Sequence, residues 1–109
     1  MLVTTTFAVE GYKVVNYLGI VRGIVVRSPT IGQGCLGGLI GIFGGHNAAY
    51  TEMCEQTRQD AYDYMVRHAK EMGANAVIGF HYDATEVVSQ SSATEVLAYG
   101  TAVVLQEIT

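Results

Sequence analysis

The residues of this chain with the clearest capacity for chemistry are His81 and Asp83, two positions apart in a run typical of a β-strand. On a strand, side chains two positions apart share one face and lie about 7 Å apart. A carboxylate at that distance can orient an imidazole as a general base or as a metal ligand. The same alternation is typical of the solvent face of a hairpin, and the sequence places no nucleophile beside the pair. Both interpretations of this candidate site stay open.

Other metal-binding residue types are scattered along the chain. Zinc and softer metals bind three or four converging His, Cys or carboxylate groups, often in CxxC or HxxxH pairs, and neither pair occurs here. Cys54 and His68 share one face of a predicted helix but lie about 21 Å apart along it, too far to bind one ion. The metal candidates are therefore His81, Asp83, His46 and Cys54, with no ligand set assigned. An ion bound by one His or Cys from each of several copies stays open.

The segment Gly32–Gly37 reads GQGCLG, a literal match to the dinucleotide-binding motif GxGxxG. That motif requires a turn between a strand and the helix of a parallel βαβ unit, with an acidic residue ending the second strand. Glu52 has the right spacing but falls inside the predicted long helix, and no parallel strand follows within reach. Glycines recur at four-residue spacing through Gly45, which favours close backbone packing over nucleotide binding.

Composition limits the class of protein. The chain has 109 residues, of which 50% are hydrophobic and 15% charged, and its formal net charge is −4. This balance excludes a disordered chain, and the absence of a basic cluster argues against nucleic acid as a partner. The length fits one domain, residues 1–109.

The sequence predicts a cytoplasmic protein that does not insert into membranes. The first six residues lack the basic segment and apolar run of a signal peptide. The most apolar window, residues 35–45, is about half of what a membrane span needs. Two cysteines are too few for a disulfide framework, so we expect free thiols.

Hydrophobic periodicity predicts an α+β fold: an antiparallel sheet with one long helix. Val, Ile and Tyr dominate residues 12–27, which predict one long strand with bulges or bends at Gly19 and Gly23. Apolar residues spaced by three and four predict a helix over about 47–72, with Asn47 as N-cap and Gly73 after its end. Further predicted elements are a β-rich piece over 4–7, a short glycine-rich helical segment in 31–45 and a closing hairpin of strands 76–88 and 94–105.

Alternation in the hairpin predicts its register. Ile78, Phe80, Tyr82 and Ala84 should share a face with Leu97, Tyr99, Thr101 and Val103. His81, Asp83 and Thr85 should then lie opposite Val96, Ala98 and Gly100 on the other face.

Both faces of the predicted strand 12–27 are apolar, so both must be covered. One helix covers only one face of a sheet, and a chain of this length has no second layer. Exposed apolar faces of this size usually mark interfaces. We therefore expect a homo-oligomer in which neighbouring copies supply the missing layer.

Three motifs resemble the YbjQ-like family of small bacterial proteins: Gly44-Gly45-His46-Asn47-Ala48-Ala49-Tyr50 opening a helix, Gly73-Ala74-Asn75-Ala76-Val77-Ile78-Gly79 after it, and Gly100-Thr101-Ala102-Val103 near the end. With the Thr4-Thr5-Thr6 start, the resemblance covers essentially the whole chain. It implies an α+β subunit that assembles into a ring, a pentamer, and it carries the family's heavy-metal-binding label.

Three functions follow as hypotheses. The first is a non-enzymatic, ring-forming binding module that holds a metal ion or small ligand between copies; its binding part rests on the resemblance alone. The second is an enzyme with a site at the subunit boundary that uses His81 or His46 with Asp83. The third is a structural oligomer whose polar hairpin face recruits a partner protein.

Overall fold

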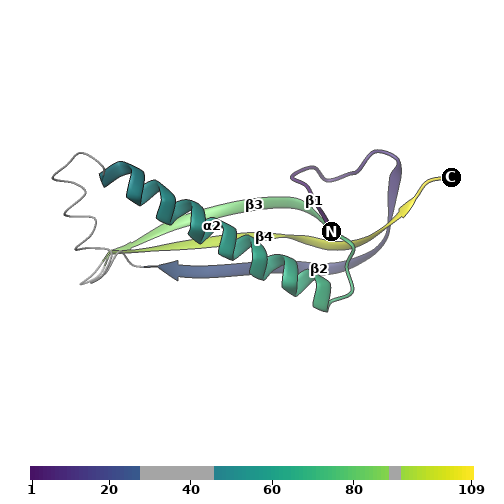
Figure 1. Ribbon diagram of the computed structural model, residues 1–109. Helices are drawn as coiled ribbons and strands as arrows, with labels where there is room; N and C mark the ends of the chain where they lie inside the picture. The colour runs from purple at the N-terminus through teal and green to yellow at the C-terminus, as the bar shows by residue number, and fades with distance from the viewer. Residues whose placement is uncertain (28–45, 89–91) are drawn as a thin grey trace.

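The computed structural model describes residues 1–27, 46–88 and 92–109. They form strands β1 (Leu2–Val3), β2 (Tyr12–Arg27), β3 (Ala76–Val88) and β4 (Ser92–Glu107) and helix α2 (His46–Glu71). The strands make one sheet in the order β1-β3-β4-β2, and α2 lies along one face of it (Figure 1). The α+β class is confirmed. The glycine-rich segment predicted to be helical, residues 31–45, lies outside the described residues.

The sheet is mixed, so the prediction of a purely antiparallel sheet is wrong. β2 and β3 both run antiparallel to β4, but β1 runs parallel to β3. The regular strand β1 is shorter and earlier than the predicted piece at 4–7, but the next residues still bond to β3. Thr4 N–H donates to Val77 O at 3.0 Å, and Thr4 O accepts from Phe80 N–H at 3.0 Å. The sequence motif gave no signal for this parallel pairing because two residues are too short for a detectable alternation.

β2 has the predicted bounds, and one of its two glycines has the predicted role. Gly19 has a φ of +119° and sits at a register shift, so the bulge there is confirmed. Gly23 lies in a regular part of the ladder and is needed for another reason. A Cβ at Gly23 would overlap Ala61 O and lie 2.6 Å from Met65 N, so the helix backbone packs directly on the strand.

Helix α2 begins and ends one residue earlier than the predicted range of about 47–72. Asn47 lies inside its first turn, so its predicted role as N-cap is wrong. Gly73 follows the helix with a φ of +88°, the left-handed conformation that favours glycine after a helix. No helix in the described ranges is long and apolar enough to cross a membrane.

The core fills the space between α2 and the sheet. Its buried members come from the helix and from all three long strands: Val21, Ala61, Met65, Ala69, Val77, Phe80, Val96, Ala98 and Ala102. A second, smaller cluster on the opposite face joins Ala76, Ile78 and Val103 under Val9. Within residues 1–27, 46–88 and 92–109, the opposite face is therefore covered at the end of the sheet near β1.

The predicted register of the hairpin is wrong beyond Ile78. Ile78 pairs with Thr101, but His81 pairs with Tyr99, so β3 carries one extra residue between these two pairs. Gly79 sits in this bulge with a φ of +61°. The extra residue turns Phe80 onto the helix side, whereas Ile78 belongs to the cluster on the opposite side.

The bulge changes the neighbours of the candidate pair. His81, Asp83 and Thr85 lie opposite Tyr99, Leu97 and Glu95, and not opposite Val96, Ala98 and Gly100 as predicted. A bulge of one residue reverses the alternation of every residue after it.

Candidate functional site

We call the side of the sheet that faces away from α2 the open face. Gly23 presents its Cβ position to the helix, so Arg22 and Ile24 present their side chains to the open face. The pairings across the three long strands place the open-face residues in four rows. These rows are Ile20–Thr101–Ile78, Arg22–Tyr99–His81, Ile24–Leu97–Asp83 and Val26–Glu95–Thr85.

The open face has an apolar side and a polar side. On β2, Ile20, Ile24 and Val26 are 75%, 53% and 61% exposed. We call these three residues the apolar stripe; Arg22 interrupts it. On β3, His81, Asp83 and Thr85 are also exposed. Large aliphatic side chains in a row on an exposed strand are typical of a surface that another layer covers.

His81 is held in one orientation by two contacts. Its Nδ1 lies 3.0 Å from Gly79 O, and its ring stacks on Tyr99 with centroids 5.9 Å apart and planes at 22°. A carbonyl oxygen only accepts, so Nδ1 carries the proton in this contact. The neutral ring then has an unprotonated Nε2, the nitrogen that can bind a metal ion or accept a proton.

Asp83 shares the open face with His81, as the sequence predicted, and is exposed like it. Two positions on a strand separate the backbones of the pair by about 7 Å, so the two side chains alone make an incomplete metal site. In the described residues, no group of three or more His, Cys, Asp or Glu side chains is placed to hold one metal ion. A heavy-metal site built from the described part of one chain therefore does not fit.

The other candidates lie elsewhere. Cys54 is a partly buried free thiol on α2, on the other side of the sheet from the His81–Asp83 pair. His46 is the first residue of α2, and its side chain lies outside what the structure describes. His68 accepts the backbone N–H of Arg22 at its Nδ1, 3.4 Å away. The structure thus brings together His81 and Asp83 and separates Cys54 from them.

Sequence reasoning missed Tyr99 and Arg22 as neighbours of His81. Both enter its row because of the bulge at Gly79. The signal was a glycine in the interior of a predicted strand, which often marks a bulge.

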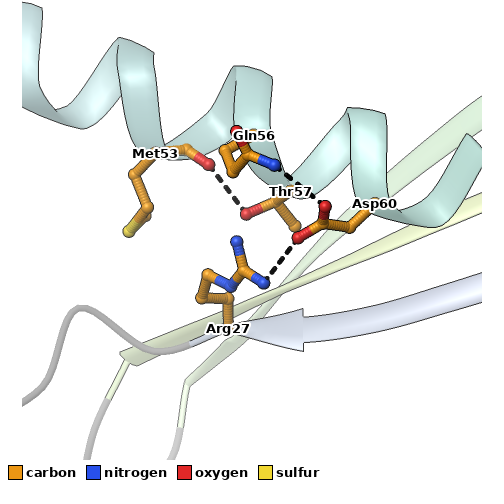
Figure 2. A network of polar contacts seen from close by, with 5 residues as sticks. All are labelled: Arg27, Met53, Gln56, Thr57 and Asp60. Atoms are coloured by element: carbon orange, nitrogen blue, oxygen red, sulfur yellow. Dashed lines mark hydrogen bonds and ion pairs between the residues drawn. The ribbon is translucent and has the colours of Figure 1, made fainter. Parts of the chain in front are cut away.

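The helix side of the sheet carries a polar network at the end of β2. Arg27 Nη2 lies 2.8 Å from Asp60 Oδ2, and Gln56 Nε2 donates to Asp60 Oδ1 at 2.9 Å (Figure 2). The hydrogen bond from Arg27, and then that from Gln56, lower the pKa of Asp60 below its ordinary value of 3.8. Thr57 Oγ1 donates to Met53 O within the same helix. These contacts join the end of β2 to α2. Each of these polar side chains has a partner within the chain, so we assign the network to the packing of the helix on the sheet.

Aromatic rings gather where α2 passes β3. Phe80 contacts Tyr62 and Tyr82 edge-on, with centroids 5.7 and 4.8 Å away, and Arg58 lies 5.9 Å from the centre of the Tyr82 ring. Burial raises the pKa of Tyr82 above 10.0, and the nearby Tyr62 acts in the same direction. Each ring in this cluster has partners in the chain, so we assign the cluster to packing.

A hollow of about 480 Å³ lies at the end of the sheet near β1, lined by Leu2, Val9, Tyr12, Asn75 and Leu105. Both polar atoms of the Asn75 amide bond to the backbone of Leu105: Nδ2 donates to its oxygen at 2.9 Å, and Oδ1 accepts its N–H at 2.7 Å. The side-chain amide of the hollow's lining is thus occupied, which leaves an apolar surface with little to select a ligand.

The chain is similar to known proteins over almost its whole length. Residues 1–106 match the model of the YbjQ family, described as "Putative heavy-metal-binding". A UPF0145 protein of Legionella pneumophila is 51% identical over 105 residues, covering 96% of this chain and 98% of its own. A UPF0145 protein of Francisella tularensis is 45% identical over 106 residues, covering 97% and 100%.

A crystal structure shows the same fold. A protein of unknown function from Pediococcus pentosaceus, of the DUF74 family, superposes with a TM-score of 0.68 at 18% identity, over 97% of this chain and 98% of that one.

Proposed function

Starting from the fact that this chain belongs to the YbjQ family, we propose that it is a homo-oligomeric binding module that holds a metal ion or a small ligand at a contact between its copies. The ring of five implied by the resemblance is part of this proposal. The family description supplies the ligand class, and the open face supplies the place.

The observation that carries the proposal is the exposed apolar stripe beside an oriented His81. Ile20 is 75% exposed. When a neighbour covers a side chain of this kind, the assembly is stabilised by about 25 cal/mol for each Å² of apolar surface removed from water. A second copy is the neighbour that is always present at the same concentration. Covering the stripe also places a second set of side chains over His81 and Asp83, which lie in the same rows.

The ion belongs between copies because one copy is not enough. The described part of one chain offers the His81–Asp83 pair but no third ligand near it. A neighbouring copy adds donors of its own at the shared boundary, so the three or four ligands that zinc and softer metals need come from two chains.

Native mass spectrometry of the untagged protein, with metal analysis of the same sample, tests this proposal. We expect an assembly that contains a fixed ratio of metal or of a small molecule to subunits. A monomer that carries nothing would sink both parts, and a bare assembly would leave the binding part without support.

An enzyme at the subunit boundary is the second candidate, and the free Nε2 of His81 favours it, because that nitrogen can act as a base. Replacing His81→Ala and, separately, His46→Ala discriminates the two. A catalyst loses turnover while it stays assembled, whereas for a binding module the readout that changes is ligand occupancy.

A further inference from the structure

We propose that the outer edge of β3, from Tyr82 to Val88, binds a basic, extended segment of a partner protein, which adds to the sheet as a further strand. The outer edge is the side of β3 that faces away from β4. This inference goes beyond the proposed function and does not depend on it, because the ligand of the proposed function lies on the open face and the partner segment lies beside the sheet. Two features carry it: the direction of the backbone groups along β3 and the charges next to Tyr82.

The backbone of β3 directs every second residue after the bulge to the outer edge. Phe80 N–H donates to Thr4 O, on the β1 side of the strand. Residues of a strand point their N–H and C=O groups alternately to one neighbour and to the other. Tyr82 and Ala84, and every second residue after them up to Val88, therefore point their N–H and C=O groups away from β4.

The far side of the sheet gives the same assignment. Arg22 N–H points outward from β2, so the next residue, Gly23, bonds to its pair Ala98 on β4. The neighbour of Ala98 on β4, Leu97, then bonds to its pair Asp83 on β3. Asp83 thus faces β4, and the residues on either side of it face the outer edge.

The other parts of the two sheet edges have partners within the chain. β1 and the residues after it lie along one end of β3, and the rest of β3 extends beyond them (Figure 1). Bonds from Thr4 and Thr6 cover β3 as far as Phe80, and His68 covers β2 at Arg22. Among residues 1–27, 46–88 and 92–109, no further strand pairs with the outer edge of β3 after Phe80. This stretch, about 23 Å long at about 3.3 Å per residue, can take one more strand.

The sequence of this stretch does not protect it against a basic segment. Proteins commonly protect an open sheet edge with Lys, with Pro or with a bulge that turns the edge away. Residues 81–88 contain neither Lys nor Pro, and the bulge at Gly79 lies before them. The acidic residues of the stretch are Asp83 and Glu86, which disfavour an acidic segment and favour a basic one.

The helix adds negative charge beside the same stretch. Tyr82 is 42% exposed on the helix side of β3. Burial is the main cause of its raised pKa, and among the charged groups Glu55 and Asp63 raise this pKa further while Arg58 lowers it. Two carboxylates therefore stand against one guanidinium around Tyr82, and that guanidinium already lies 5.9 Å from the centre of the ring.

A strand added at this edge places alternate side chains next to Tyr82 and Ala84, at cross-strand spacings of about 5 Å. Ala84 is exposed and small, so it leaves room beside the Tyr82 ring. A Lys or Arg in this position covers the ring with its stem and brings its charge toward Glu55 and Asp63. Backbone hydrogen bonds supply the affinity of such a contact, and the alternate side chains supply its specificity.

A peptide of alternating lysine and threonine, blocked at both ends, tests the proposal with the full chain. We expect calorimetry to show binding about tenfold tighter, or more, than that of the same peptide with glutamate in place of lysine. A form that is N-methylated at alternate residues keeps the charges but lacks the donors, and should bind about tenfold more weakly or worse. Equal binding of the methylated form, or no binding of the lysine peptide, overturns the proposal.

Hydrogen exchange followed by NMR locates the contact. The peptide should slow the exchange of the Tyr82 and Ala84 amides and leave those of Asp83 and Thr85 unchanged, because the latter two already bond to β4. Slow exchange at Tyr82 and Ala84 before any peptide is added would mean that a second copy or another part of the chain occupies the edge, and would overturn the proposal.

Replacing Ala84→Pro removes one outward donor that the pairing with β4 does not use, and proline is tolerated at such edge positions. We expect this variant to bind the lysine peptide about tenfold more weakly, with an unchanged circular dichroism spectrum. Wild-type affinity in a folded Ala84→Pro protein overturns the proposal.

Charge variants on α2 decide the question even where Ala84→Pro does not fold. Glu55→Lys combined with Asp63→Lys should reverse the preference, so that the glutamate peptide binds more tightly. Glu52→Lys combined with Glu71→Lys is the matched control, with the same change of net charge at exposed positions of the same helix, and should keep the preference for lysine. The same response in both double variants would mean that overall charge, and not this edge, selects the peptide.

The outcomes separate this inference from the proposed function, since none of these variants changes His81 or the apolar stripe. A bare monomer that binds the lysine peptide with the expected pattern keeps this inference and overturns the proposed function. An assembly that carries metal but does not bind the peptide does the reverse.

Discussion

The backbone N–H of Arg22 donates a hydrogen bond to Nδ1 of His68, 3.4 Å away, across the outer edge of the sheet. Among the strands that the structure describes, β2 is the last on its side of the sheet, so its outward N–H groups have no strand beside them there. The helix therefore supplies the acceptor that a further strand would supply, and an edge protected in this way is less open to pairing with other chains.

Replacing His68→Ala removes that acceptor. We expect the amide hydrogen of Arg22 to exchange with solvent faster, while the stability of the protein changes by less than about 1 kcal/mol, because Arg22 is exposed and water can replace the lost partner. Hydrogen exchange followed by NMR measures this. His81→Ala, on the other face, serves as the control, and equal exchange in His68→Ala and the wild type would contradict the assignment.

Replacing Gly23→Ala should weaken the contact between β2 and α2. The added Cβ meets backbone atoms of Ala61 and Met65, which cannot move away as a flexible side chain can. We expect a loss of about 1–3 kcal/mol in urea unfolding, with altered near-ultraviolet dichroism as the helix shifts. Gly11→Ala is the comparison, because nothing lies within 4 Å of that position and only its φ of +84° opposes the change. Unchanged dichroism in Gly23→Ala would mean that the helix does not rest on the strand as described.

Replacing Asn75→Asp should disrupt the two hydrogen bonds between its side-chain amide and the backbone of Leu105. The amide of Asn75 both donates to and accepts from the backbone of Leu105, whereas a carboxylate only accepts. We expect a loss of about 1 kcal/mol, because one donor is removed and an anion is left against a carbonyl oxygen. Thermal unfolding measures it. Asn16→Asp, an exposed change of the same kind on β2, should cost less, and an equal cost at the two positions would refute the argument.

The ion pair of Arg27 and Asp60 predicts a pH dependence of stability. The pKa of Asp60 is lowered in the folded state, so folding favours the ionised form of this carboxyl group over the protonated form. Its contribution is complete above pH 3.8 and is lost as the pH falls through the lower folded value. Asp60→Asn should remove this part of the acid dependence and Glu52→Gln, an exposed change in the same helix, should not. Identical acid unfolding curves for Asp60→Asn and the wild type would contradict the prediction.

The long elements could be predicted from the sequence because their patterns are extended. β2 matches its predicted bounds, and α2 differs by about one residue at each end. Apolar residues repeated over many positions outweigh local exceptions, and Gly73 marks the helix end by its own backbone preference. The same reasoning identified the apolar surface of β2 that α2 leaves exposed.

The details of the site could not be predicted, for two physical reasons. A register depends on the number of residues between pairs, so the extra residue at Gly79 changed the neighbours of His81 without changing any residue type. The parallel pairing of β1 depends on contacts between Leu2 and Ala76, far apart in the chain, and two residues carry no periodicity of their own. His81 and Asp83 were identified as one pair, but Tyr99 and the bond to Gly79 come from the bulge.

The bulge at Gly79 decides which side chains of β3 face away from the helix, although it changes no residue type. If the same residues paired without the bulge, His81 and Asp83 would turn to the helix side, and Phe80 and Tyr82 would turn to the open face. Deletion of Gly79, in contrast, would restore a regular ladder and leave these four side chains on their present faces. Which residues of β3 face away from α2 therefore depends on how the strand pairs at Gly79 as well as on its composition.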